Sequence, residues 1–121
     1  MEIAYWVIAG LLAALYAWSG AKKLLQSRDA LRPMMGWVDD VPLPLTRSIG
    51  AVEVAGAVGL LVPPLVGLLP WLAVVAAIGF VFLQLAAAGF HLSRDEQRQV
   101  PFNLLLMLLA AFAAWFATTV V

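Results

Sequence analysis

The sequence predicts an all-α membrane protein, a polytopic antiparallel bundle of four transmembrane helices with both termini on the outer side. Two observations lead to this fold class. Hydrophobic residues make up 64% of the 121 residues and the mean hydropathy is +0.99, whereas soluble domains contain about 45–50% apolar residues. The apolar residues also gather in segments of the roughly 17–25 residues that a membrane helix needs. We therefore expect a single transmembrane domain over residues 1–121.

The four expected spans cover about residues 3–25, 45–62, 70–92 and 101–121. The first follows an acidic start and contains no clear small-residue cleavage site, so we expect a retained span rather than a signal peptide. The second should end at Pro63-Pro64, because proline lacks an amide donor and clashes with the preceding turn. The third begins near Pro70, since proline is tolerated in the first turn of a helix.

All seven Lys and Arg residues lie at the ends of the spans or in two loops, residues 26–44 and 93–100. Four spans place these two loops on the same side of the membrane. Because basic residues are enriched in cytoplasmic loops, we expect both loops in the cytoplasm and both termini outside. Loop 26–44 combines methionines and Trp37 with acidic residues and prolines, a composition that fits either an interfacial element or a plain linker.

Small residues recur at spacings of three to four along each span, and such residues let membrane helices pack closely. The four stripes are Ala9, Ala13, Ala17 and Ala21; Ala51, Ala55 and Gly59; Ala73, Ala77 and Ala87; Ala110, Ala114 and Ala117. They predict a compact bundle. The same stripes would also suit the seam of a homo-oligomer, so the oligomeric state stays open.

A few polar residues interrupt the spans, and depth counted from the basic ends places them at one level in the inner half of the membrane. They are Ser19, Lys23, Arg47, Glu53, Gln84, His91 and Asn103. An ionised Glu53 costs several kcal/mol there unless it is paired, hydrated or protonated. Arg47 lies about 120° away on the same helix, so we expect the partner of Glu53 on another helix, with Lys23 nearest by depth and His91 next.

This cluster has two interpretations. In the first, Glu53 is the centre of a site for a ligand, a proton or a quinone headgroup, because ionisable groups inside membranes are usually functional. In the second, the cluster is a polar latch that joins the helices without any ligand, formed by Glu53, Lys23, Arg47 and Asn103. Residues near the membrane interface relax part of the cost of burial by snorkelling, so the sequence does not choose between the two.

Other functions are disfavoured by what the sequence lacks. Seven basic and seven acidic residues balance, which gives no reason to expect a nucleic-acid partner. The chain has no cysteine, so thiol redox chemistry and thiolate metal sites are excluded. His91 is the sole histidine, and one histidine alone is a poor metal ligand. We therefore expect no metal or haem, and we assign no catalytic residue.

Four short motifs together carry a resemblance to a known family: SGAKKL at 19–24, RSIGAVEVAGAVGLLVPP at 47–64, LAAAGFHLSRDE at 85–96 and PFNLLL at 101–106. They resemble the DoxX family, in its DoxX-like branch of small bacterial four-helix membrane proteins. The resemblance implies a multi-pass protein of the bacterial cytoplasmic (inner) membrane, similar in architecture to the vitamin K epoxide reductase type. It also implies that the family's polar and glycine positions are Gly20, Lys23, Gly50, Glu53, His91 and Asn103.

Members of this family include a membrane subunit of a thiosulfate:quinone oxidoreductase and components of oxidative-stress complexes. The resemblance therefore implies a small membrane subunit or scaffold of a redox-related complex, with membrane or redox protein partners and contact with quinone or lipid near the polar cluster. Whether the chain is itself an enzyme stays open. Without cysteine it would act through a bound quinone or a partner subunit, and a non-catalytic role for the chain alone is favoured.

The alternative is a small transporter or channel that uses Glu53. Four short helices around one membrane glutamate are similar to small multidrug exporters and fluoride channels. Those proteins often insert in two opposite orientations, whereas every Lys and Arg of this chain lies on one expected side. A chaperone or anchor for another membrane protein is a third interpretation, which the sequence does not separate from the redox subunit.

Overall fold

The computed structural model describes residues 2–120, and all regular structure within them is helical. In chain order the helices are α1 (Glu2–Leu25), α2 (Arg28–Leu31), the 3₁₀ helix η1 (Gly36–Asp40), α3 (Leu43–Val66), α4 (Leu72–Ser93), the 3₁₀ helix η2 (Gln97–Gln99) and α5 (Val100–Ala117). Four of these segments are long and apolar enough to cross a membrane. The predicted class, an all-α bundle with four membrane-spanning helices, is confirmed.

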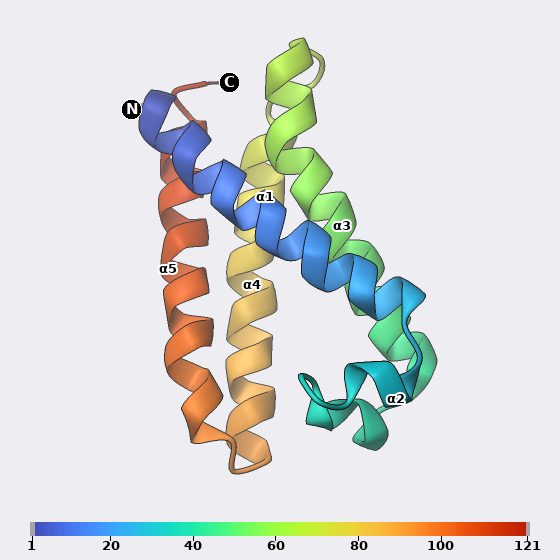
Figure 1. Cartoon of the computed structure of the whole chain (residues 1–121). Helices are drawn as coiled ribbons and strands as arrows, with labels where there is room; N and C mark the ends of the chain where they lie inside the picture. Colours follow the sequence, from blue (N-terminus) through green and yellow to red (C-terminus); the bar gives the residue numbers. More distant parts are fainter. Residues whose placement is uncertain (1, 121) are drawn as a thin grey trace.

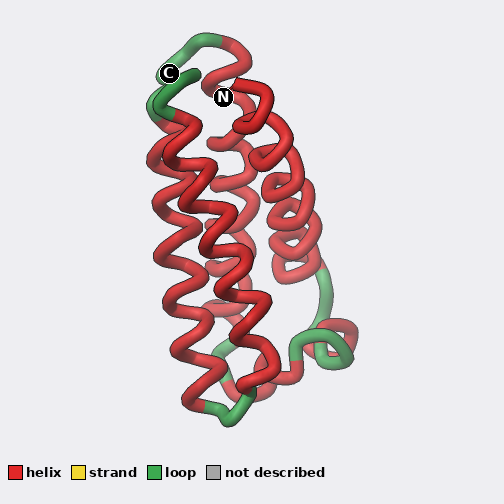
Figure 2. The backbone as a smooth tube through the Cα atoms, turned by 90° about the vertical axis from the view of Figure 1, so that its left-hand side faces the viewer, coloured by secondary structure: helices red, strands yellow, loops and turns green. Residues whose placement is uncertain are grey.

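The four long helices form two antiparallel pairs that pack on each other (Figure 1). α1 packs most extensively against α3, and α4 against α5. Both termini lie at one end of the bundle, which we call the terminus end, while α2, η1 and η2 lie at the opposite end, the loop end (Figures 1 and 2). α1 runs obliquely, so the α1/α3 pair moves away from α4 and α5 toward the loop end.

The terminus half of the bundle is closed by small buried side chains. Tyr5 is fully buried and belongs to one continuous apolar core with alanines from all four long helices: Ala9, Ala13, Ala57, Ala73, Ala77, Ala110, Ala113 and Ala117. Lipid tails are as apolar as these side chains, so close van der Waals contact between small residues is what holds membrane helices together. The helices are therefore tightest at this end.

The packing stripe expected on the second span was wrong at two of its three residues, and only Gly59 lies against a neighbouring helix, close to Ala76 of α4. Ala51 and Ala55 are exposed, whereas the face of α3 toward the bundle carries Gly50, Ala57 and Leu60. Alanine is tolerated both between helices and against lipid, so its spacing alone does not identify the inner face. The buried face is instead the one on which glycine allows the closest approach of a neighbouring helix.

The second span was expected to end before its two prolines, and this was also wrong, because α3 continues through both of them to Val66. The ring of Pro64 leaves the carbonyl of Leu60 without its helical donor. The hydroxyl of Tyr5 donates to that carbonyl oxygen instead, at 2.5 Å. The helix ends one turn later at Gly67, whose φ of 71° suits a left-handed cap.

The segment between α1 and α3 is folded. Leu31, Met35 and Val38 form a small buried cluster that Trp37 packs against. Arg32 joins the two short helices, since its side chain donates to Asp29 of α2 and to Asp39 of η1. The hydrogen bond from Arg32 holds the pKa of Asp39 below its ordinary value. The loop is therefore a compact unit with its own contacts.

Candidate functional site

α1 and α3 touch backbone to backbone at two glycines. A Cβ atom on Gly20 would lie 2.6 Å from the carbonyl oxygen of Gly50, and one on Gly50 would lie 2.7 Å from that of Gly20. Only residues without a side chain allow such an approach. Lys23 and Glu53 each follow one of these glycines by three residues, so the contact brings their side chains together.

Lys23 and Glu53 form a buried ion pair. The Lys23 Nζ donates to Glu53 Oε1 and also to the hydroxyl oxygen of Ser19, at 3.0 Å. The two charged side chains are only 10% and 4% exposed. The second carboxylate oxygen, Glu53 Oε2, accepts no hydrogen bond from the described residues. Pairing neutralises two charges that would otherwise be costly inside a membrane, and it leaves one carboxylate oxygen available.

A second polar group joins α4 and α5 to α1. Asn103 Nδ2 donates to Gln84 Oε1 at 2.9 Å, and Gln84 Nε2 donates to the hydroxyl oxygen of Tyr16 at 2.6 Å. Because Tyr16 accepts in this bond, its own hydroxyl proton remains available for another partner. The Tyr16 ring stacks on Phe80, with ring centroids 3.8 Å apart. Gly56 provides the room for the Phe80 ring, because a Cβ atom there would clash with it.

A third group lies where α4 ends. Glu96 Oε1 accepts from His91 Nδ1 and from Arg94 Nε, both at 3.0 Å. An ionised carboxylate can only accept, so His91 Nδ1 carries the proton. The hydrogen bonds from His91 and from Arg94 lower the pKa of Glu96. Arg94 also pairs with Asp40, which ties η1 to the end of α4.

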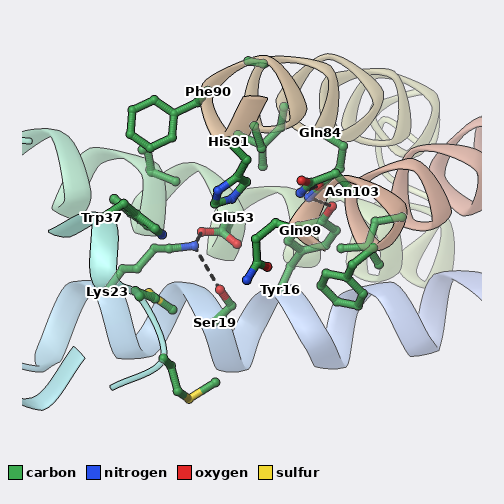
Figure 3. A pocket seen from close by; sticks show the side chains of 18 of the residues that line it. Tyr16, Ser19, Lys23, Trp37, Glu53, Gln84, Phe90, His91, Gln99 and Asn103 are labelled. Atoms are coloured by element: carbon green, nitrogen blue, oxygen red, sulfur yellow. Dashed lines mark hydrogen bonds and ion pairs between the residues drawn. The ribbon is translucent and has the colours of Figure 1, made fainter. Parts of the chain in front are cut away.

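These three groups surround one cavity of about 500 Å³ in the loop half of the bundle. Figure 3 shows side chains pointing into it from α1, α3, α4 and α5, with Trp37 of η1 beside the ion pair. Small-molecule sites usually enclose about 300–1,000 Å³. Of the seven residues predicted as a polar cluster, the structure brings six to this cavity: Ser19, Lys23, Glu53, Gln84, His91 and Asn103.

A comparison with known protein families identifies a relationship for this chain. The family model described as the DoxX-like family matches residues 7–113. The chain belongs to the DoxX-like family. The resemblance read from its motifs is thereby confirmed, and the match includes every residue that lines the cavity. No curated protein and no solved structure matches the chain of this DoxX-like protein.

The seventh residue of the predicted cluster, Arg47, lies elsewhere in this DoxX-like protein. Its Nη1 donates to the carbonyl oxygens of Lys23 and Gln26, both at 2.6 Å. These carbonyls belong to the last turn of α1 and the residue after it, where the helix leaves acceptors unpaired and attracts positive charge. Arg47 therefore caps α1. Asn103 bonds to Gln84 and not to Glu53, so the single four-residue latch considered from the sequence does not form.

Seven further polar or aromatic residues line the cavity and were not part of the predicted cluster: Tyr16, Trp18, Trp37, Phe90, Glu96, Gln99 and Phe102. Spacing is a signal that would have found Tyr16, because it lies seven residues before Lys23 and hence on the same helical face. Trp37 arrives only because the loop folds back over the bundle. Gln99, the last residue of η2, points into the cavity just before α5 begins (Figure 3), and no pattern in its neighbourhood indicates this.

Proposed function

We propose that this DoxX-like protein is a small membrane subunit of a redox-related complex and that its cavity holds the headgroup of a quinone. One observation carries the proposal: a cavity of ligand size within the bundle, whose lining combines a buried ion pair with neutral polar groups and aromatic rings. Sites that bind small molecules combine an apolar wall with a few placed polar groups.

The free hydrogen-bonding capacity of the site suits such a ring. The Lys23 ammonium has three protons and uses two of them, on Ser19 and Glu53. Its third proton and the free hydroxyl proton of Tyr16 are donors for the carbonyl oxygens of a quinone. Glu53 Oε2 is an acceptor for the hydroxyl of the reduced form.

Flat aromatic walls complete the fit. The rings of Trp37 and Phe90 line the cavity, and aromatic faces and edges pack well against another ring. The residues of this chain would thus bind and orient the headgroup. Since the sequence has no cysteine, exchange of electrons with the bound quinone would be the work of a partner subunit.

The distribution of basic residues also supports one orientation of the bundle in the membrane. All seven Lys and Arg residues belong to the loop end of the bundle, and the positive-inside bias supports a cytoplasmic loop end in a bacterial inner membrane, with both termini outside. Reporter fusions test this orientation. A phosphatase that is active only outside the cytoplasm should be active when fused to the C-terminus, and an inactive fusion together with a fluorescent cytoplasmic reporter would reverse the assignment.

A transporter that uses Glu53 is supported by the position of that residue, which is buried inside a span. The terminus half of the bundle, however, is filled by an apolar core, and the Tyr16–Phe80 stack separates it from the cavity. Transport needs an exit on both sides, so we favour the binding subunit. Ion or proton flux in proteoliposomes that Glu53→Gln abolishes would favour the transporter instead.

Quinone retained by the purified protein tests the proposed function. Protein isolated in mild detergent from its own membrane should carry quinone in its lipid extract. Tyr16→Phe removes one donor and should weaken retention about tenfold, the value of one good hydrogen bond. Tyr5→Phe is the matched control, because the same hydroxyl is removed far from the cavity and retention should not change.

Two outcomes would contradict quinone binding in this cavity. The first is an extract without quinone from protein whose thermal unfolding is normal. The second is equal loss of quinone in both tyrosine variants, which would reflect general destabilisation of the bundle. Co-purification of an oxidoreductase with the wild-type chain would support the subunit role in the same experiment, and a chain that always isolates alone would count against it.

A further inference from the structure

We infer that the cavity opens sideways into the hydrocarbon of the bilayer, between α1 and α5, and that its ligand is a quinone whose apolar tail leaves through this opening. This inference rests on the proposed function and deepens it. It specifies a lipid-dissolved ligand and a lateral route, in place of a small soluble quinone that arrives from water.

Two aromatic residues mark the opening. Trp18 of α1 and Phe102 of α5 both line the cavity, and both are also on the outside of the bundle, 48% and 50% exposed. Side chains that belong to the cavity wall and to the outer surface at once form the rim of an opening. Figure 1 agrees, because α1 lies beside α5 at the terminus end and then runs away from it toward the loop end.

The sides between paired helices are closed. α1 and α3 are in backbone contact at Gly20 and Gly50. α4 and α5 are joined across the cavity wall by the hydrogen bond between Gln84 and Asn103. Toward the terminus end the stacked rings of Tyr16 and Phe80 form the cavity's boundary, with the apolar core behind them.

The gap between α3 and α4 at the loop end is bridged by η1. The Trp37 ring packs edge-on against Phe90 of α4, with centroids 6.2 Å apart, and Asp40 pairs with Arg94 at the end of α4. Val41 and Pro42 then lead directly into α3. Leu45 of α3 and Ala86 of α4 also line the cavity and are exposed, but η1 bridges the gap between their helices. The α1–α5 side has no such bridge among the described residues, so it is the side left for a ligand.

The depth of the opening suits a lipid quinone. Lys22, one turn after Trp18 on α1, holds its ammonium 5.2 Å from the Trp18 ring centroid. Lysine and tryptophan in this arrangement are typical of the membrane interface. The rim therefore lies just inside the headgroup region, with Leu15 and Leu106 continuing the apolar cavity wall toward the hydrocarbon. A ring bound beside Lys23 would pass its tail between Trp18 and Phe102 into the lipid.

The test compares three probes in nanodiscs that contain the whole chain: a tailless benzoquinone, the same ring with a decyl tail, and decanol. Quinone binding is measured as quenching of tryptophan fluorescence, since Trp37 lines the cavity. Each affinity is referred to the concentration of the probe in the membrane, which removes the effect of partitioning. The wild type should bind both quinones, and decanol should not displace the tailless ring.

Phe102→Glu places a carboxylate on the rim, where it must be dehydrated for an apolar tail to pass. The tailed quinone should bind about tenfold more weakly, a difference of about 1.4 kcal/mol, while the tailless ring should bind within about twofold of wild type. Leu105→Glu is the matched control. Leu105 is 52% exposed on the same helix and does not line the cavity, so neither affinity should change.

The outcomes separate the two claims. If neither quinone binds, or if decanol displaces both, the cavity is not a quinone site and the proposed function is wrong. Alternatively, both quinones bind, and the Phe102→Glu and Leu105→Glu variants show the same affinity for the tailed quinone. In that case the quinone site stands and the lateral opening is wrong. Trp18→Glu repeats the test on the other rim, where Lys22 can pair with the new carboxylate, in case the Phe102 variant does not fold.

Discussion

The two halves of this bundle are held together in different ways. At the terminus end the helices are held together by many small apolar contacts. Three of the residues that make them are fully buried alanines, Ala73, Ala77 and Ala110. At the loop end a few polar contacts hold the helices around a cavity, chiefly the Lys23–Glu53 ion pair and the bond between Gln84 and Asn103. The helices converge at the first end and separate toward the second (Figure 1).

This difference shows what a cavity in a small membrane bundle requires. Dispersion contacts are individually weak and need close packing, so they cannot hold helices apart around an open space. Charged and amide side chains reach further and bond in fixed directions. Breaking one buried polar contact at the loop end should therefore have a large effect, and breaking one contact at the terminus end a smaller effect, because many contacts hold the helices together there.

The largest effect is expected from breaking the ion pair. Glu53→Leu leaves Lys23 buried without its counter-charge and should lower the free energy of unfolding by about 3 kcal/mol. Thermal unfolding of the detergent-solubilised protein measures the loss. Replacing both partners, Lys23→Met with Glu53→Leu, should recover most of it, because no charge is then left unpaired. An unchanged midpoint in the single variant would show that the pair does not hold the loop end together.

The glycine contact comes next. Gly50→Ala puts a methyl group against a backbone carbonyl of α1, which cannot move like a flexible side chain, and overpacking of this kind costs about 2 kcal/mol. Gly79→Ala is the same substitution on α4, where nothing lies within 4 Å of the new Cβ atom, so that variant should be at least as stable as wild type. Equal midpoints for the two variants would contradict the close approach of α1 and α3.

A smaller effect is expected at the terminus end. Tyr5→Phe removes the hydroxyl that donates to the Leu60 carbonyl oxygen and should cost about 1 kcal/mol. Pro64→Ala supplies the helical amide that this carbonyl lacks, so Tyr5→Phe should cost clearly less in that background. The two single variants and the double variant form a cycle that thermal unfolding can measure. Additive losses would mean that the hydroxyl does not replace the missing helical donor.

The smallest effect concerns Glu96 and pH. Its pKa is lowered by the hydrogen bonds from His91 and Arg94, so the folded state favours the ionised carboxylate. The resulting stability is present above the ordinary carboxyl pKa of 4.5 and is lost as pH falls through the lower folded pKa. Because the side chain is 30% exposed, solvent screening limits the contribution to less than about 1 kcal/mol.

Glu96→Gln provides the control for this pH effect. The amide keeps the size and an acceptor oxygen but does not ionise, so the variant should lose the part of the acid-side slope that Glu96 contributes. Unfolding midpoints between neutral pH and about pH 3 would show it. Identical slopes for the variant and wild type would exclude Glu96 as a stabilising charge at the loop end.

Sequence reasoning reached the parts of this fold that depend on composition and depth. Long apolar segments gave the four spanning helices, and counting from the basic ends placed Lys23 close to the level of Glu53, the residue with which it pairs in the structure. Such inferences need only the rise of a helix and the cost of charge in lipid. These inferences hold whichever way each helix is rotated about its own axis.

The remaining features depend on rotation and on contacts between distant segments. The inner face of α3 was misjudged because alanine suits lipid and protein neighbours alike, as Ala51 shows. Its end was misjudged because the donor that satisfies Leu60 comes from Tyr5, 55 residues away. Arg47 was grouped with the cluster by depth, but its long side chain turns back to the end of α1. Trp37 reaches the cavity only through the fold of its loop.

The ion pair between Asp40 and Arg94 also constrains the order in which this protein can be assembled. A chain is made from its N-terminus, and its early segments can fold before later ones exist. Lys23 and Glu53 are both present once α3 is complete, so the first hairpin can neutralise its own charges as it enters the membrane. Within the second hairpin, the neutral amides of Gln84 and Asn103 satisfy each other by a hydrogen bond. η1 finds its anchor at Arg94 only when α4 has been synthesised, so the cavity is finished in one of the last steps of biogenesis.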